Sequence, residues 1–436
     1  MNKSTLKEKK YNWFAYAIIL LPFLYQYKGV GNVVSLGEIL VAATTIFVFC
    51  QDGFKLKNIN IYLALFYTIS MVSIILCMWF GYFDISAAMV TGVRMLFYAL
   101  VVVVARDHFD IETIGNVYTC LVFGFSIYLL IQYAFHMATG QYLPIYISSG
   151  LQFPPEARPS DLAIYYRWNY RSSSLFLEPG YFVLYVMPLV SMLFFKCHKT
   201  KFELLTLVVT IAAILFSTAS AGIVGLVIVF TVYLFGRVNN QSKYRFFLKI
   251  IILGTAITGL MLFLTLSDAA NLTIGRLSNG GSINSRVTRG FLIFSDLPFF
   301  HQIFGVGLNN LAPYMIKHGI RTLFDEGNLN YMASIVQILV FTGIIGWISL
   351  VVFIGNLILK VRRVTMNDSL GTHLFGSSAL WAMLFLFIFI ICYEAVMYTY
   401  RFAFYFVLLE ALIKQYREEK RKKITSYENF NDRHST

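Results

Sequence analysis

Glu178 stands where a polar segment meets one of the most apolar stretches of the chain. The stretch reads RSSSLFLEPGYFVLYVM over residues 171–187. An ionisable side chain at the mouth of such a stretch normally has a compensating partner or a function. Pro179 suits the first turn of a helix, so Glu178 lies at or beside the N-cap, where the helix dipole favours a carboxylate. Glu178 is therefore a helix-terminal acid or, with Arg171 close in sequence, part of a site.

Arginines and aromatic residues gather just upstream of Glu178, in the segment 140–174. Four of the nine prolines of the chain lie there, which predicts a structured, largely non-helical loop. Guanidinium groups pair with phosphate, and aromatic faces stack on sugar rings. The segment therefore suits an anionic lipid headgroup that carries sugars, with an interfacial aromatic belt as the alternative. The candidate sugar contacts are Tyr166, Trp168 and Tyr170.

A second polar segment contains NSRVTRGFLIF at residues 284–294. Helical spacing places Arg286 and Arg289 on one face of a short amphipathic helix at the membrane surface, where a diphosphate fits between them. A plain surface helix with solvated arginines is the alternative. His318, Asp325 and Glu326 close this segment; the two acids are also placed to cap the next helix.

A few ionisable residues lie at membrane depth within apolar runs, where such groups mark sites or internal pairs. Arg94 is near the middle of its run and needs a carboxylate or a phosphate inside the bundle. Glu394 and Arg401 are close enough in sequence to pair with each other.

The elements that position these residues are apolar helices. Of the 436 residues 58% are hydrophobic and only 13% are charged, against about 25% charged residues in soluble domains. Apolar runs of the length that a bilayer requires recur along the chain. We predict an all-α polytopic membrane protein, a single integral membrane domain over 1–436 with about twelve transmembrane helices. The predicted spans are 13–29, 34–51, 59–80, 86–104, 113–137, 175–195, 202–218, 221–236, 246–266, 331–359, 372–392 and 395–413.

The distribution of Lys and Arg predicts the orientation. Most of the 35 basic residues lie in the N-terminal tail, in the turns that follow the even-numbered predicted spans and in the C-terminal tail 414–436. By the positive-inside rule both termini are cytoplasmic, and the long segments 138–174 and 267–330 are extracytoplasmic. The first apolar run lacks a small-residue cleavage site and is interpreted as a retained helix. The basic tail suits anionic lipid rather than nucleic acid.

The sequence lacks the motifs that are typical of several kinds of chemistry. The five cysteines have no paired spacing, which argues against a disulfide framework or a zinc site. There is no P-loop, GxSxG, HExxH or DxD motif. We therefore expect no metal, no nucleotide and no other cofactor.

Three of these motifs resemble a known family. RSSSLFLEPGYF opens the span after the first loop, SRVTRGF is followed by FGVGLNN at 304–310, and EGNLNYMASIVQILVFTGIIG at 326–346 enters the next span. Together with two large external loops, they resemble the bacterial O-antigen, capsule and exopolysaccharide polymerases, which are related to O-antigen ligases. Two positions depart from the pattern. Ala221 stands where many relatives have Arg, and Asp325 and Glu326 stand where ligases often carry a His.

The resemblance implies a reaction on the outer face of the bacterial cytoplasmic membrane. A hydroxyl of one undecaprenyl-diphosphate-linked oligosaccharide attacks the anomeric carbon of another, and the lipid diphosphate leaves. Cationic side chains would stabilise the leaving group, and a base would deprotonate the hydroxyl. The resemblance implies a separate membrane protein that regulates chain length. The expected diphosphate ligands are Arg171, Arg286, Arg289 and Arg94; Glu178 is the first candidate base, ahead of Glu326, Asp325 and His318.

Two other functions remain open. A ligase of similar architecture would move the finished glycan to a different acceptor. A flippase would show repeat symmetry and functional charges near the membrane midplane. The two halves of this chain do not mirror each other in loop lengths, and charge gathers in the outward segments, which favours an enzyme.

Overall fold

The computed structural model describes residues 12–30, 33–53, 59–80, 85–151, 171–236, 287–319, 332–366 and 374–434. Within these ranges the fold is all-α, with fourteen α-helices, one short 3₁₀ helix at Ser149–Leu151 and a small antiparallel pair of strands, β1 (Lys28–Val30) and β2 (Val34–Ser35). The helices are α2 (Asn12–Leu24), α3 (Leu36–Asp52), α4 (Ile61–Trp79), α5 (Ile85–His108), α6 (Ile111–Thr139), α8 (Pro179–Phe195), α9 (Lys201–Phe216), α10 (Ser220–Gly236), α14 (Arg289–Asp296), α15 (Phe299–Phe304), α16 (Leu311–Lys317), α17 (Ser334–Thr365), α18 (Ser377–Tyr393) and α19 (Tyr400–His434).

The helices follow the apolar runs of the sequence. Each predicted span contains a helix except 246–266, which lies outside the described residues. Four described helices are long and apolar enough to cross a membrane: α4, α5, α6 and α17. Shorter apolar helices are α2, α8, α10 and α18. The structure thus confirms the all-α fold and several candidate membrane-crossing helices, but not the full number of twelve.

Local side-chain chemistry explains where helices begin. Ser35 and Glu38 form a capping box at the start of α3, and Thr200 and Glu203 form one at α9. In both, each side chain satisfies a backbone N–H that the helix leaves without an internal partner. The closely spaced helices α9 and α10 are separated by Thr218, whose φ of 52° is incompatible with a continuing right-handed helix.

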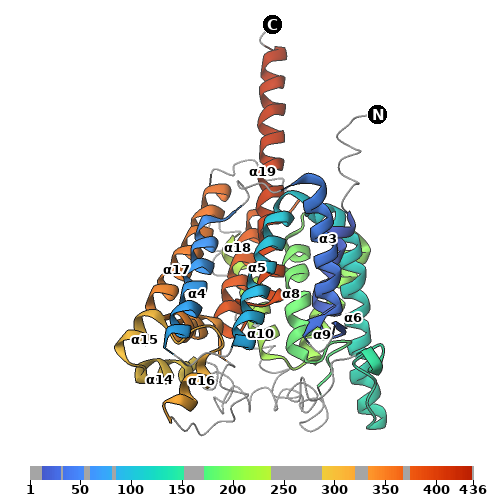
Figure 1. The fold of residues 1–436 in the computed structure, drawn as a ribbon. Helices are drawn as coiled ribbons and strands as arrows, with labels where there is room; N and C mark the ends of the chain where they lie inside the picture. Colours follow the sequence, from blue (N-terminus) through green and yellow to red (C-terminus); the bar gives the residue numbers. More distant parts are fainter. Residues whose placement is uncertain are drawn as a thin grey trace.

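The two ends of the bundle carry different elements. Helix α19 projects beyond one end, and α14, α15 and α16 lie at the other (Figure 1). We call these the tail end and the loop end. Contacts between chain segments agree with this division: Lys414 approaches the Asp107 carbonyl at the tail end, and Lys317 donates to the Phe80 carbonyl at the loop end. The predicted basic turns Lys196–Lys201 and Lys360–Arg363 flank helix ends on the tail side.

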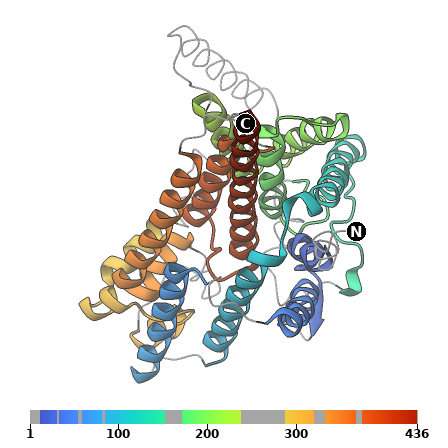
Figure 2. The same cartoon turned by 90° about the horizontal axis from the view of Figure 1, so that it is seen from above.

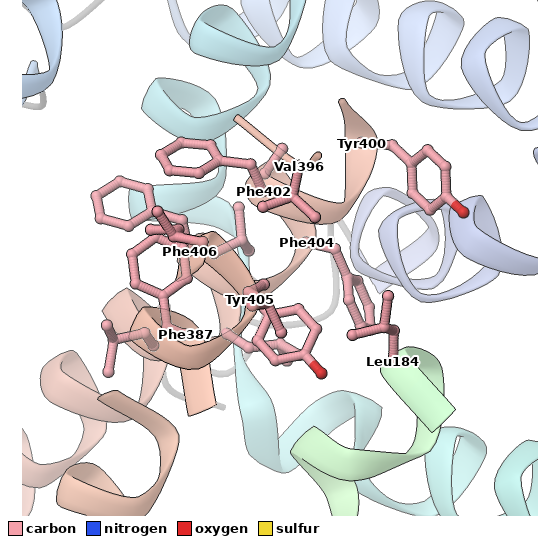
Figure 3. Close-up of a cluster of buried hydrophobic side chains, with 14 of the residues drawn as sticks. Leu184, Phe387, Val396, Tyr400, Phe402, Phe404, Tyr405 and Phe406 are labelled. Atoms are coloured by element: carbon pink, nitrogen blue, oxygen red, sulfur yellow. The ribbon is translucent and has the colours of Figure 1, made fainter. Parts of the chain in front are cut away.

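Helix α19 forms the centre of the packing. It contacts α2, α5, α6, α8, α17 and α18, and the view along the bundle shows it surrounded by them (Figure 2). Its first turns carry a dense aromatic cluster that meets Phe387 of α18 and Leu184 of α8 (Figure 3). The rings of Phe402 and Phe406 are stacked with centroids 5.8 Å apart. Aromatic rings bury large areas with few rotatable bonds, so this cluster fixes the start of α19 at the loop end.

Helix α17 is interrupted at Gly343, which has a φ of 67°. The loop after α15 enters this break: the N–H of Val306 donates to the Val340 carbonyl at 3.0 Å, and that of Gly307 donates to Phe341 at 2.9 Å. Ser73 of α4 donates to the same Phe341 carbonyl at 2.7 Å. An interrupted helix leaves backbone carbonyls that must find other partners away from water. Val306 and Gly307 of the FGVGLNN motif supply these partners, so their N–H groups are used for structure rather than for holding phosphate.

Adding a methyl group at Gly343 is expected to destabilise the protein. A Cβ there would lie 2.1 Å from the Ile303 carbonyl oxygen, and the positive φ is itself unfavourable for alanine. We expect Gly343→Ala to lower the free energy of unfolding by at least about 1–3 kcal/mol, measured as a lower melting temperature in detergent. Gly355→Ala, on the same helix with nothing within 4 Å of its Cβ, is the matched control. Equal melting temperatures for the two variants would contradict the assigned role of Gly343.

Candidate active site at the loop end

Glu178 is the N-cap residue of α8, as Pro179 predicts. Its backbone is extended, Pro179 occupies the first turn, and the Glu178 carbonyl accepts the N–H of Tyr181 at 3.0 Å. Its carboxylate, however, makes no capping hydrogen bond. The described residues also provide no ion-pair partner for this half-buried group. The side chain is thus at the helix terminus without acting as its cap, and within the described ranges its oxygens have no ion-pair partner.

Arg171 is anchored to the turn between α9 and α10. Its Nε donates to the Thr218 hydroxyl and one terminal nitrogen donates to the Thr218 carbonyl, both at 3.0 Å. These bonds hold the guanidinium and the strained Thr218 backbone in fixed positions. The structure therefore brings together two motifs that are separate in sequence: the polar segment before α8 and the STASAG segment, 217–222.

The serines between Arg171 and Glu178 are fully buried. Ser174 is held by Gln132, which accepts its N–H at 2.8 Å and donates to its carbonyl at 3.0 Å. The hydroxyls of Ser172 and Ser173 have no hydrogen-bond partner within the described ranges. Buried polar groups without partners are uncommon in folded proteins. The segment is thus rigidly positioned, and it contains polar groups that the described protein atoms leave unsatisfied.

Arg401 lies on the first turn of α19 and approaches the first turn of α8. Its guanidinium carbon is 3.8 Å from the ring centroid of Tyr181, which is one turn after Glu178 on α8. Its Nε donates to the Tyr400 hydroxyl at 3.2 Å. Glu394 acts on Arg401 electrostatically, but no direct ion pair forms between them in the described structure. The pairing expected from the sequence is therefore only a longer-range attraction, and the cation is held mainly by aromatic rings.

Arg94, in contrast, has the carboxylate that its depth requires. Its Nε lies 3.1 Å from Oε1 of Glu38, and it also donates to the Val33 carbonyl. Glu38 is 4% exposed and accepts a further hydrogen bond from Tyr98 at 2.8 Å. This arrangement resolves the alternative left open by the sequence. Arg94 forms an internal ion pair, so its position does not require a phosphate.

The short helix expected near Arg289 exists as α14, although within the described residues it begins at Arg289 itself. It packs against α17 through Gly290, where a Cβ would lie 2.3 Å from Val336. The opposite side exposes Phe291 and Leu292, as an amphipathic helix at a membrane surface would. Six predicted site residues lie outside the described ranges: Tyr166, Trp168, Tyr170, Arg286, Asp325 and Glu326.

His318 is exposed at the end of α16, with its ring 4.5 Å from that of Tyr314. Tyr314 in turn contacts His301, whose ring centroid is 5.1 Å away. Burial lowers the pKa of His301, and its Nδ1 is 3.1 Å from the Gly305 carbonyl. His301 is therefore neutral near pH 7 and part of the packing around α15, while His318 is the more accessible of the two.

No protein-family model matches this chain, and a search of curated proteins finds no match. The family resemblance consequently depends on the short motifs themselves. The geometry adds two residues that motif reading did not include among the site residues, Arg401 and Thr218. In the sequence, Arg401 was marked only by being an ionisable residue at membrane depth. No sequence pattern marked Thr218, because its role depends on a contact with Arg171, which is 47 positions away.

Proposed function

We propose that this protein is a polysaccharide polymerase that joins undecaprenyl-diphosphate-linked oligosaccharides on the outer face of the bacterial cytoplasmic membrane. The observation that carries the proposal is the approach of Arg401 to Tyr181 in the first turn of α8, which begins beside Glu178, with Arg171 seven residues before Glu178 in the chain. Among the described residues, the Glu178 carboxylate has no ion-pair partner. It lies seven residues after Arg171 in the chain and one helical turn before Tyr181, whose ring Arg401 covers. That combination suits proton transfer beside a developing diphosphate charge.

The proposal assigns a role to each group. Glu178 accepts the proton of the attacking hydroxyl, and Arg401 and Arg171 stabilise the leaving diphosphate, together with Arg286 and Arg289 from the segment around α14. Tyr166, Trp168 and Tyr170 contact sugars, and Asp325, Glu326 and His318 are the competing bases. The orientation belongs to the same proposal: about twelve spans, the loop end outside, both termini in the cytoplasm, and a chain-length regulator as membrane partner.

Deletion of the gene, followed by sizing of the surface glycan, tests the function against its two rivals. A product limited to single repeat units supports the polymerase. Full-length glycan that remains on its lipid carrier would instead indicate a ligase. Repeat units trapped in the cytoplasm would indicate a flippase.

Arg286→Ala and Arg289→Ala are expected to abolish polymer while leaving protein abundance unchanged. Their guanidinium groups would bind the diphosphate, and loss of one such electrostatic contact typically costs about 10²–10³ in rate. Glycan length and immunoblotting of membranes measure the two quantities. Ser295→Ala, on α14, is the control, because its hydroxyl donates locally to the Leu292 carbonyl. Normal chain lengths in both arginine variants would exclude them as diphosphate ligands.

A further inference from the structure

Three arginines line a small cavity at the tail end, away from the candidate active site. The cavity has a volume of about 220 Å³ and lies between the end of α5 and the part of α19 that begins to project from the bundle. Arg106 belongs to α5, and Arg417 and Arg421 belong to α19, which also contributes Ile413. The proposed polymerase activity does not use this cavity.

The acids of the lining do not neutralise this arginine wall. Glu410 forms an ion pair with Lys360 of α17, and both side chains are mostly buried. Asp107, Lys414 and Glu418 also line a second, larger cavity, so they lie on the boundary between the two. The ionisable residues that line the small cavity alone are therefore the three arginines and one acid, Glu410, which Lys360 already pairs.

The cations of the wall repel one another. Arg417 and Arg421 are four positions apart on α19, and like charges at this spacing destabilise a helix. Partial desolvation lowers the pKa of Arg417, and the positive charges of Arg106 and Arg421 lower it further, against the attraction of Glu410. Arg417 makes no hydrogen bond or direct ion pair with the described residues. A bound anion would relieve this repulsion.

The cavity lies where membrane-crossing helices end. It adjoins the last residues of α5, which is long and apolar enough to cross a membrane from Ala88 to His108. Lys360, the partner of Glu410, is close to the end of α17, another such helix. The headgroup region of a bilayer begins where the apolar part of a spanning helix ends. Basic pockets between spanning helices at this depth suit anionic headgroups.

Guanidinium forks match the oxygens of a phosphate group better than any other common anion except a carboxylate. The volume is below the about 300–1,000 Å³ of sites that enclose a whole small molecule, as expected for one headgroup phosphate. We propose that this cavity binds the phosphate of an anionic phospholipid from the membrane leaflet at the tail end, with Arg417 as a principal ligand. General attraction of a basic tail to lipid would not distinguish among its cations, whereas this site requires particular ones.

Titration of phosphatidylglycerol into the full-length protein in a neutral detergent tests the proposal, with binding followed by native mass spectrometry and by the melting temperature. We expect saturable binding at one site per chain and a higher melting temperature. Phosphatidylcholine, whose headgroup has no net charge, should have neither effect. Arg417→Gln should weaken phosphatidylglycerol binding about tenfold. Arg417 is exposed, so this variant should fold normally. Arg417→Lys keeps the charge without the planar fork and should be intermediate.

Lys422→Gln is the matched control, because it removes one exposed positive charge from the same part of α19 but does not line this cavity. It should bind phosphatidylglycerol as the unmodified protein does. Equal losses in Lys422→Gln and Arg417→Gln would overturn the proposal in favour of diffuse attraction by the basic tail. Unchanged affinity in Arg417→Gln would place the headgroup elsewhere and overturn it as well. Inorganic phosphate that displaces the lipid at equal concentration would make a soluble phosphate, not a lipid, the ligand.

Discussion

Glu178→Gln is expected to stop polymer formation while the protein remains folded and abundant. The substitution keeps the size and hydrogen-bonding capacity of the side chain but removes its basicity. Because the Glu178 carboxylate makes neither a capping bond nor an ion pair in the described structure, its loss should hardly affect stability. General-base catalysis typically contributes about 10²–10⁴ in rate, so the glycan should shift to single repeat units.

The measurement is glycan length on gels beside membrane abundance and melting temperature of the purified protein. Glu178→Asp is the conservative partner: it retains the carboxylate but shortens its reach, and should keep partial activity. A Glu178→Gln variant that polymerises at full rate would show that Glu178 is only a helix-terminal acid. The base would then be sought among Glu326, Asp325 and His318.

Arg401→Met is expected to reduce polymerisation by about 10²–10³. The methionine retains apolar contact with the Tyr181 ring, against which the guanidinium now stacks at 3.8 Å, but removes the charge. Since no direct carboxylate partner of Arg401 exists in the described structure, the change leaves no broken ion pair behind. The loss should therefore appear in activity, measured with purified enzyme and lipid-linked substrate, rather than in abundance. Arg401→Lys keeps the charge without the planar stacking group and should be intermediate.

Arg94→Met provides the contrasting control. Here the substitution leaves the buried Glu38 carboxylate without its cation. The Arg94 side chain is 31% exposed, so the cost is below the value of about 3–5 kcal/mol for breaking a fully buried pair. We expect a lower melting temperature and a lower yield, with activity reduced only in proportion to the folded protein. If instead Arg401→Met loses stability and Arg94→Met loses specific activity, the assignment of the two arginines is reversed.

The two arginines also illustrate how far sequence could predict the site. An arginine at membrane depth predicts that an anion or an internal partner is required, and this held for Arg94. Which partner it has could not be predicted, because Glu38 is 56 residues away and on another helix. For Arg401 the nearest acid in sequence, Glu394, was the reasonable partner. Helix α18 ends at Tyr393 and α19 begins at Tyr400, and the intervening turn leaves Glu394 outside direct contact.

The sequence alone determined the properties that depend on local chemistry. Apolar runs of suitable length predicted helices, Pro179 placed Glu178 at the start of α8, and STASAG marked the break between α9 and α10, because these features involve neighbouring residues. Only the tertiary structure decided which distant groups meet. It joined Arg171 to Thr218, stacked Arg401 on Tyr181, and directed the FGVGLNN backbone into the break of α17. Such contacts depend on helix packing and on the pairing of buried polar groups across the bundle, neither of which has a signature in local spacing.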